Sequence, residues 1–211
     1  MNNHLPFTVS GEKMHDCYKM AGSYNIFFIS HEPLYTKEEL LAINDTIQNS
    51  NTKQFEPEEK GAKFANKKSK VSLILWLEIK KHLEKLEDFI YDANDEFFHY
   101  DIFDISDFHY LNINEYDEKN NSYDWHVDCN QYGAEEDLKL TCLLNISTEP
   151  YDGGRLHLSG LDEEGQELIF KEFNKPGHGL IFTSNRQHKV EPITSGKRKT
   201  LSYWARGPAW K

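Results

Sequence analysis

The second half of this 211-residue chain is a succession of short segments rich in β-forming residues, broken at close intervals by Gly, Asn, Asp and Pro. Short strands separated by turn signals are typical of a β-sandwich or jelly roll. We therefore predict a mostly β fold with flanking helices, whose core is a double-stranded β-helix (jelly roll, cupin-like) over about residues 99–211. The predicted strands cover residues 101–115, 123–129, 138–146, 154–159, 166–172, 178–183, 187–193 and 198–205.

The first half of the chain carries two helical patterns. The motif Thr36-x-x-Glu39 matches a capping box and precedes apolar residues at helical spacing, which predicts a helix beginning there. A long amphipathic helix is predicted after Ser69, because apolar residues recur at helical spacing as far as Ile90 and charged residues occupy the other face.

These helices define a supporting role for the N-terminal half. We expect residues 1–98 to form a helical support region that packs on one sheet of the jelly roll, within a single domain of residues 1–211. Residues 25–30 are the expected edge strand of this region, and residues 50–68 are expected to form a mobile loop.

Composition narrows the possible partners and the compartment. A net charge of −11 disfavours nucleic acid as a partner, because binding its backbone requires clustered cations. Three cysteines without a C-x-x-C pair (Cys17, Cys129 and Cys142) suit reduced thiols in the cytosol. The chain has no apolar run of about 18 residues and no signal-peptide pattern. We therefore predict a cytoplasmic protein without a membrane partner.

A candidate metal site begins at His126-Val-Asp128. Side chains alternate along a strand, so His126 and Asp128 point to the same face. Alone, His-x-Asp is a common surface pattern, and a lone His188 is an ordinary turn histidine. Together, two imidazoles and one carboxylate match the 2-His-1-carboxylate triad of non-haem Fe(II) oxygenases, which leaves open positions on the metal.

Arg198 lies ten residues beyond His188 and is expected on the next strand, opposite His188 if residues 192–196 form the turn. Alternation would point its two lysine neighbours outward and Arg198 inward, where a bidentate guanidinium can bind a buried carboxylate. Thr200 shares that face and could add a hydroxyl. The alternative interpretation of Arg198 is a basic surface cluster with those lysines.

The chain resembles the prolyl-4-hydroxylase-like branch of the 2-oxoglutarate- and Fe(II)-dependent oxygenases over about residues 100–210. The resemblance implies that His126, Asp128 and His188 bind iron, that Arg198 binds the C5 carboxylate of 2-oxoglutarate, and that Tyr116 helps to hold this co-substrate. It departs from many relatives at residues 117–122, where they have a glycine, and a loop at the active-site mouth is expected there. The matching elements are Tyr116, Tyr123, His126-Val-Asp128, Leu138–Ser147, Tyr151-Asp-Gly153-Gly154-Arg-Leu156, Pro176-Gly177, Phe182, Ser184, His188-x-Val190-x-Pro192-x-Thr194-x-Gly196-x-Arg198 and Trp204-x-x-Gly207-Pro208.

The resemblance also implies a reaction. Fe(II), 2-oxoglutarate and O₂, with ascorbate as the expected reductant, would hydroxylate an unactivated C–H bond and release succinate and CO₂. The expected target is a prolyl or other amino-acid residue of a peptide or protein. Related halogenases lack the carboxylate ligand, so Asp128 favours hydroxylation. No catalytic residue beyond the metal site is expected, and Trp204 and Tyr123 are the candidates for the substrate pocket.

Three alternatives remain open at the level of sequence. The substrate could be a free amino acid or small molecule, since substrate choice depends on loops. A nucleobase demethylase is disfavoured, because those relatives have a second arginine six residues beyond the co-substrate arginine and this chain has Trp204 there. A non-catalytic jelly-roll binding module would keep the fold with a vestigial metal site.

Overall fold

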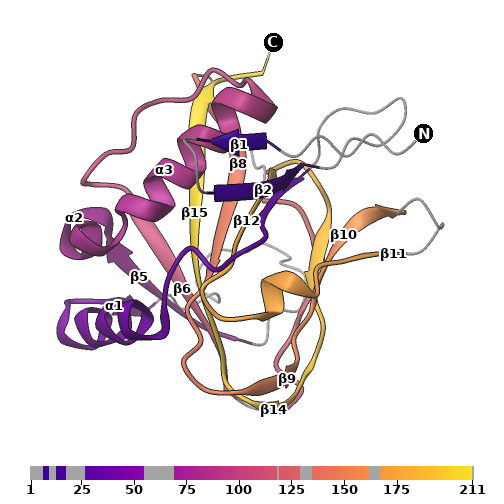
Figure 1. The fold of residues 1–211 in the computed structure, drawn as a ribbon. Coiled ribbons are helices and arrows are strands. Elements are labelled where there is room, and N and C mark those ends of the chain that lie inside the picture. Colours follow the sequence, from indigo (N-terminus) through magenta and orange to yellow (C-terminus); the bar gives the residue numbers. More distant parts are fainter. Residues whose placement is uncertain are drawn as a thin grey trace.

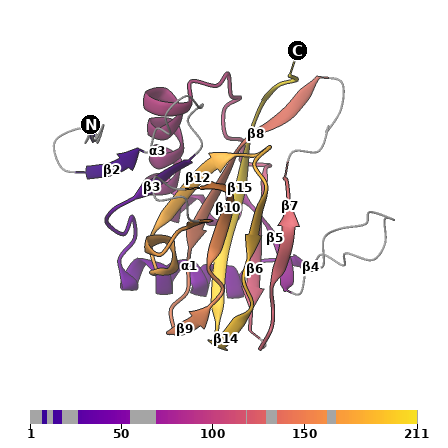
Figure 2. The same cartoon turned by 90° about the vertical axis from the view of Figure 1, so that its right-hand side faces the viewer.

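Two antiparallel sheets form the body of the computed structural model (Figure 1), which describes residues 7–9, 13–17, 27–54, 69–117, 119–128, 135–161 and 167–210. The major sheet has nine strands in the order β1-β2-β3-β12-β8-β15-β6-β5-β4, and the minor sheet has four in the order β11-β10-β13-β7. A two-stranded sheet of β9 and β14 lies at the end of the molecule away from the C-terminus (Figure 2). The predicted mostly β jelly roll with flanking helices is confirmed.

The helices and strands have the following bounds. The strands are β1 Phe7–Val9, β2 Lys13–Cys17, β3 Phe27–Ser30, β4 Lys53–Gln54, β5 Lys70–Leu75, β6 Tyr110–Tyr116, β7 Tyr123–His126, β8 Glu136–Asn145, β9 Tyr151–Gly153, β10 Leu156–Leu161, β11 Glu167–Ile169, β12 Gly179–Thr183, β13 His188–Val190, β14 Ile193–Gly196 and β15 Arg198–Pro208. The helices are α1 Lys37–Asn49, α2 Trp76–Ile79, η2 Lys80–His82, α3 Glu84–Ala93, the π-helical η3 Asn94–Phe98 and η4 Glu172–Asn174.

The two faces of the major sheet bury different cores. On the outer face, α1, α2 and α3 cover the sheet (Figure 1), and their apolar side chains pack against residues such as Leu201 and Tyr203 of β15. Because strand side chains alternate, the even-numbered residues of β15 from Arg198 to Trp204 face the interior between the two sheets. There the second core joins Phe182 of the major sheet to residues of the minor sheet.

The N-terminal half is less helical than its pattern suggested. The helix predicted after Ser69 is wrong at its start, because residues 70–75 form strand β5, which pairs along its whole length with β6. Side chains alternate between the two faces of β5, and Ile74 packs into the core beneath the helices. Pairing with β6 adds β5 to the major sheet. Helical structure begins only at Trp76, and the predicted amphipathic helix is interrupted before its main part, α3.

Other local expectations can be compared directly. The capping box is confirmed: the Glu39 amide donates to Thr36 Oγ1 at 3.3 Å and the Thr36 amide donates to Glu39 Oε2 at 2.8 Å. The expected edge strand at residues 25–30 is an inner strand, since β3 pairs with both β2 and β12. Residues 101–109 form no strand, and β6 begins at Tyr110.

Two expectations fall on residues outside the described part of the chain: most of the loop expected at residues 50–68, and the thiol of Cys129. Cys142 lies in the described part and is a free, buried thiol, as expected for a reduced cysteine. Within the described residues, no helix has the length and apolar character needed to cross a membrane.

Candidate active site

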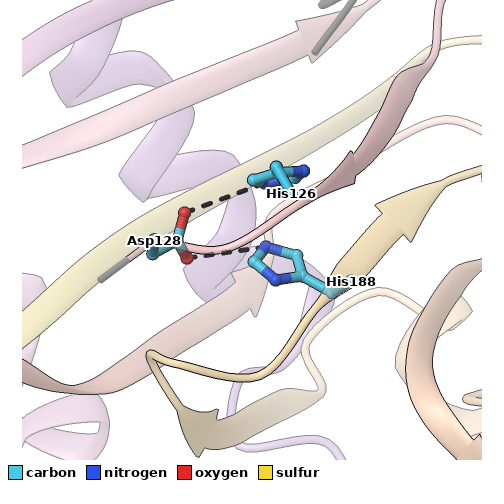
Figure 3. Close-up of side chains that lie close together, drawn as sticks. All are labelled: His126, Asp128 and His188. Carbon is cyan, nitrogen blue, oxygen red and sulfur yellow. Dashed lines mark ion pairs between the residues drawn. The ribbon is translucent and has the colours of Figure 1, made fainter. Parts of the chain in front are cut away.

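The two candidate histidine ligands lie opposite each other on neighbouring strands of the minor sheet. β13 pairs with β7 so that His188 faces His126 in the register, and Asp128 follows directly after β7. The Asp128 amide donates to the Ser184 carbonyl at 3.1 Å, which holds the chain beyond β7 against the end of β12. One ligand atom from each of the three residues lies within 4.8 Å of the other two. Figure 3 shows the three side chains pointing toward a common centre.

Both imidazoles are oriented by the backbone. His126 Nδ1 lies 2.7 Å from the Asp124 carbonyl oxygen, and His188 Nδ1 lies 3.0 Å from that of Arg186. A carbonyl can only accept, so each Nδ1 carries the proton and donates it, which leaves the Nε2 lone pair for a metal. The Nε2 atoms lie 3.7 Å (His126) and 3.5 Å (His188) from the two oxygens of Asp128.

Aromatic rings pack against both histidines. The Tyr123 ring stacks on His126 with centroids 3.5 Å apart, and the Phe182 ring meets His188 edge-on at 4.8 Å. Burial and the nearby Asp128 carboxylate raise the pKa of Tyr123, so its phenol stays protonated. These contacts fix the ring planes and limit the access of water to the three ligand atoms.

The donor set fits a divalent transition metal. Two neutral imidazole nitrogens and one carboxylate approach from one side, and this geometry is diagnostic of non-haem Fe(II) sites with open positions. Neither imidazole needs to change its tautomer to bind. His126, Asp128 and His188 are therefore the residues that would hold the metal.

A second feature of the interior is a buried cation that needs an anion. Arg198 is only 2% exposed, and its Nε has no hydrogen-bond partner. Its guanidinium carbon lies 5.2 Å from the Tyr116 ring centroid and 5.6 Å from that of Phe173. Among the described residues no carboxylate forms an ion pair with it, and a buried charge without a counter-ion costs several kcal/mol by order of magnitude. A ligand carboxylate would satisfy this site.

The surroundings of Arg198 differ partly from the sequence-based picture. Arg198 does not lie opposite His188: it belongs to the major sheet and pairs with Tyr116, because residues 193–196 form β14 instead of a simple turn. The interpretation of Arg198 as part of a surface cluster is wrong, since the residue is buried. Its neighbour Lys199 does point outward and pairs with Glu115 at 2.8 Å.

Polar groups complete the pocket around this cation. Tyr116 is 3% exposed, and burial raises the pKa of its phenol, which the Arg198 charge and the Ser69 hydroxyl oppose. Tyr116 is thus a neutral donor beside the guanidinium. Thr200 is buried on the same face. Nothing in the sequence indicates that Ser69 belongs to this pocket, because a helix is predicted to begin after it. The pairing of β5 with β6 brings Ser69 to Tyr116.

Comparison with known proteins agrees with this geometry. Residues 111–206 match the 2OG-Fe(II) oxygenase superfamily. This segment belongs to that superfamily. The oxygenase segment contains β6 to β15 almost completely, and with them all three candidate metal ligands, Arg198 and Tyr116. Fe(II) and 2-oxoglutarate are the metal and co-substrate that the superfamily and the His-Asp-His triad imply.

A hydroxylase of known type is similar to part of this chain. The chain is 33% identical over 85 residues to a PKHD-type hydroxylase of Synechococcus sp. (strain CC9605); the match covers 39% of this chain and 36% of that protein. It therefore spans about a third of the length of that relative.

Solved structures share the fold. A prolyl-4-hydroxylase of Pseudomonas putida has a TM-score of 0.61 at 15% identity, over 87% of this chain and 93% of its own. A prolyl hydroxylase of Trichoplax adhaerens, in complex with a hypoxia inducible factor peptide fragment, has a TM-score of 0.63 at 18% identity, over 85% and 82%. The viral collagen prolyl hydroxylase of Paramecium Bursaria Chlorella virus-1 has a TM-score of 0.54 at 14% identity, over 89% and 97%.

Gly154 allows Arg198 to enter the interior between the two sheets. Gly154 has φ +61°, and a Cβ at this position would lie 2.9 Å from Arg198 Cδ and 2.4 Å from Ile193 Cδ1. A side chain here would therefore push the arginine away from Tyr116. Gly153 also has a positive φ (+76°), and a Cβ there would meet the Pro192 carbonyl oxygen.

The two candidate substrate-pocket residues lie at the metal end. Trp204 pairs in the register with Thr141, whose hydroxyl contacts Asp128, and its Nε1 is buried without a hydrogen-bond partner. Tyr123 stacks on His126 from β7. Trp204 is therefore the strand neighbour of a residue that contacts Asp128, and Tyr123 packs directly on one candidate ligand.

Removing one histidine should strongly weaken metal binding. We expect His188→Ala to weaken Mn(II) binding by more than the roughly 10–100-fold that loss of an outer-shell partner costs, because a direct ligand is lost. Lys189→Ala, which changes the neighbouring side chain on the outer face, should bind Mn(II) as the wild type does. Calorimetric titration of the metal-free proteins measures this, and near-normal affinity in His188→Ala would refute the ligand assignment.

Removing the buried cation should affect 2-oxoglutarate and leave the metal alone. Truncating one partner of a buried charge pair costs about 2–5 kcal/mol, so Arg198→Ala should weaken 2-oxoglutarate binding to the Mn(II)-loaded protein by at least about 30-fold. Mn(II) affinity should be unchanged, and the exposed neighbour Lys197→Ala serves as the control. Equal 2-oxoglutarate affinity in the wild type and Arg198→Ala would exclude this role.

Adding a methyl group at Gly154 should disturb the same pocket. Gly154→Ala should lower stability by about 1–3 kcal/mol, because of its positive φ, and should also weaken 2-oxoglutarate binding. Gly160→Ala is the matched control: it also has a positive φ (+138°), but its Cβ would approach Leu168 at 3.2 Å. The control should lose stability only. Thermal melts and 2-oxoglutarate titrations separate the two effects, and unaltered co-substrate binding in Gly154→Ala would contradict the prediction.

Proposed function

We propose that this protein is an Fe(II)- and 2-oxoglutarate-dependent dioxygenase that hydroxylates a prolyl residue of a peptide or protein. The observation that carries this proposal is that one interior contains both the His126–Asp128–His188 cluster and a buried guanidinium with which no carboxylate of the described residues forms an ion pair. A vestigial binding module has no reason to keep a buried cation without a carboxylate partner, which destabilises the fold when no ligand is bound.

Each part of the site has a separate task. Bound Fe(II), with 2-oxoglutarate and O₂, supplies the oxidation that converts an unactivated C–H bond to C–OH and releases succinate and CO₂. His126, Asp128 and His188 would hold the metal through two imidazole nitrogens and one carboxylate. Arg198, with Tyr116 and Thr200, would bind the distal carboxylate of the co-substrate.

The apolar interior protects this chemistry from water. Leu143, Phe182 and Val190 are at most 7% exposed and belong to the core between the two sheets. They surround polar groups whose mutual attraction is stronger in a region of low dielectric constant. The residues of this chain therefore contribute binding, orientation and water exclusion.

The substrate part of the proposal rests on the metal end of the site. A prolyl residue has no N–H, so its backbone can only accept hydrogen bonds. The unpartnered Trp204 Nε1–H is a donor of matching type, and the Tyr123 ring, stacked on His126, offers an apolar surface at the candidate metal centre. The solved structures of similar fold include a prolyl hydroxylase bound to a peptide fragment.

Nucleobase repair fits these residues less well. The position six residues beyond Arg198 is Trp204, and the chain carries a net charge of −11, which repels a nucleic-acid backbone. A free amino acid is the remaining alternative substrate, and the assay below distinguishes it from a peptide.

The proposal predicts coupled turnover. With Fe(II), ascorbate, 2-oxoglutarate and O₂, the protein should convert proline-containing peptides from a library to hydroxylated products and release one succinate per hydroxyl group. Mass spectrometry with fragmentation identifies the hydroxylated residue, and succinate is measured in parallel. His126→Ala is the control and should form neither product.

Two results would contradict the proposal. Hydroxylation of free proline or another amino acid, with no peptide modified, would reassign the substrate and keep the reaction. An absence of succinate with every peptide and amino acid, from protein shown to bind Fe(II), would exclude the dioxygenase activity.

A further inference from the structure

The two oxygens of Asp128 have different surroundings. Oδ1 lies 3.7 Å from His126 Nε2, whereas Oδ2 lies 3.5 Å from His188 Nε2 and also accepts a hydrogen bond of 2.8 Å from Thr141 Oγ1. Thr141 is fully buried. A hydroxyl donor to an ionised carboxylate forms a strong, charge-assisted bond. One oxygen of the carboxylate is therefore engaged by the protein before any metal binds.

Thr141 is held by its position in the sheet. It lies on the central strand β8 and pairs with Phe182 of β12 on one side and with Trp204 of β15 on the other. A β-branched side chain has few accessible χ1 rotamers, so its hydroxyl direction is largely set by the backbone. Thr141 is thus a donor fixed in the middle of the major sheet, aimed across the interior at the candidate metal centre.

Ser184 completes the arrangement from β12. Its Oγ lies 3.1 Å from Thr141 Oγ1, and its carbonyl accepts the Asp128 amide. A hydroxyl has one proton but two acceptor lone pairs, so Thr141 can donate to Asp128 and accept from Ser184 at the same time. Two neighbouring strands therefore hold both the backbone and one carboxylate oxygen of Asp128.

We propose that Thr141 is a positioning residue that keeps Asp128 a ligand through a single oxygen. With Oδ2 bonded to Thr141, Oδ1 is the oxygen free for the metal. A carboxylate bound through both oxygens would occupy one of the open positions that the co-substrate and O₂ require. Thr141 thereby keeps those positions open. The inference rests on the proposed function, because it assumes that the triad binds a metal.

The test separates metal binding from co-substrate binding. Loss of an outer-shell partner alone costs about 10–100-fold in metal affinity. In Thr141→Val the released Oδ2 can bind the metal as an additional donor, which offsets this loss, so Mn(II) binding should change by less than about threefold. 2-Oxoglutarate binding to the Mn(II)-loaded protein should weaken by about tenfold, because Oδ2 then occupies a position that the co-substrate requires. Thr141→Ser retains the hydroxyl and should restore 2-oxoglutarate affinity. Both affinities are measured by calorimetric titration without O₂, so no turnover is involved.

A merely structural role for Thr141 predicts a different pattern. General loosening of the site would weaken Mn(II) and 2-oxoglutarate together, and Thr141→Ser would behave like Thr141→Val. Either that pattern or unchanged 2-oxoglutarate affinity in Thr141→Val would overturn the inference. If Thr141→Val does not fold, Thr141→Ala gives the same comparison, because it also lacks the hydroxyl and adds no bulk. Wild-type protein that binds neither Mn(II) nor 2-oxoglutarate would instead refute the proposed function.

Discussion

The pairing of β7 with β13 is the constraint on which the candidate site depends. It places His126 directly opposite His188, and a shift of this register by one residue would turn one histidine to the outer face of the minor sheet. The carbonyls of Asp124 and Arg186 then select the tautomer of each imidazole. Asp128 depends on the same pairing, because it follows β7 and is anchored to Ser184 at the end of β12. The metal site is therefore a property of strand register as much as of three side chains.

A buried positive charge, that of Arg198, lies in the same interior as the candidate metal ligands. Arg198 is buried against two aromatic rings, and its Nε has no partner. The apolar core between the sheets, which stabilises the fold, offsets the free-energy cost of this buried charge. A dicarboxylate that bridges Arg198 and the metal would remove that cost, so the same feature that destabilises the ligand-free protein favours co-substrate binding.

The sequence predicted the candidate metal ligands and Arg198, but not the strands and neighbouring residues that position them. The ligand spacing, the arginine ten residues beyond His188 and the strand pattern are local features, so residue order predicts them. The pattern after Ser69 was misassigned, because Leu73, Trp76 and Leu77 also fit a helical period, and only tertiary pairing with β6 decides for a strand. Ser69 and Thr141 were missed for the same reason: neither carries a motif, and each becomes relevant through strands distant in sequence. The residues 193–196 likewise form β14 only because β9 pairs with them.

The central claim is that one ligand joins the triad to Arg198, and a crystal structure of the protein grown without O₂ with Mn(II) and 2-oxoglutarate tests it most directly. The account predicts one anomalous peak for manganese among His126 Nε2, His188 Nε2 and a single oxygen of Asp128. It also predicts 2-oxoglutarate density that runs from the metal to the Arg198 guanidinium. Manganese bound elsewhere, or 2-oxoglutarate on the metal with its distal carboxylate away from Arg198, would contradict the account.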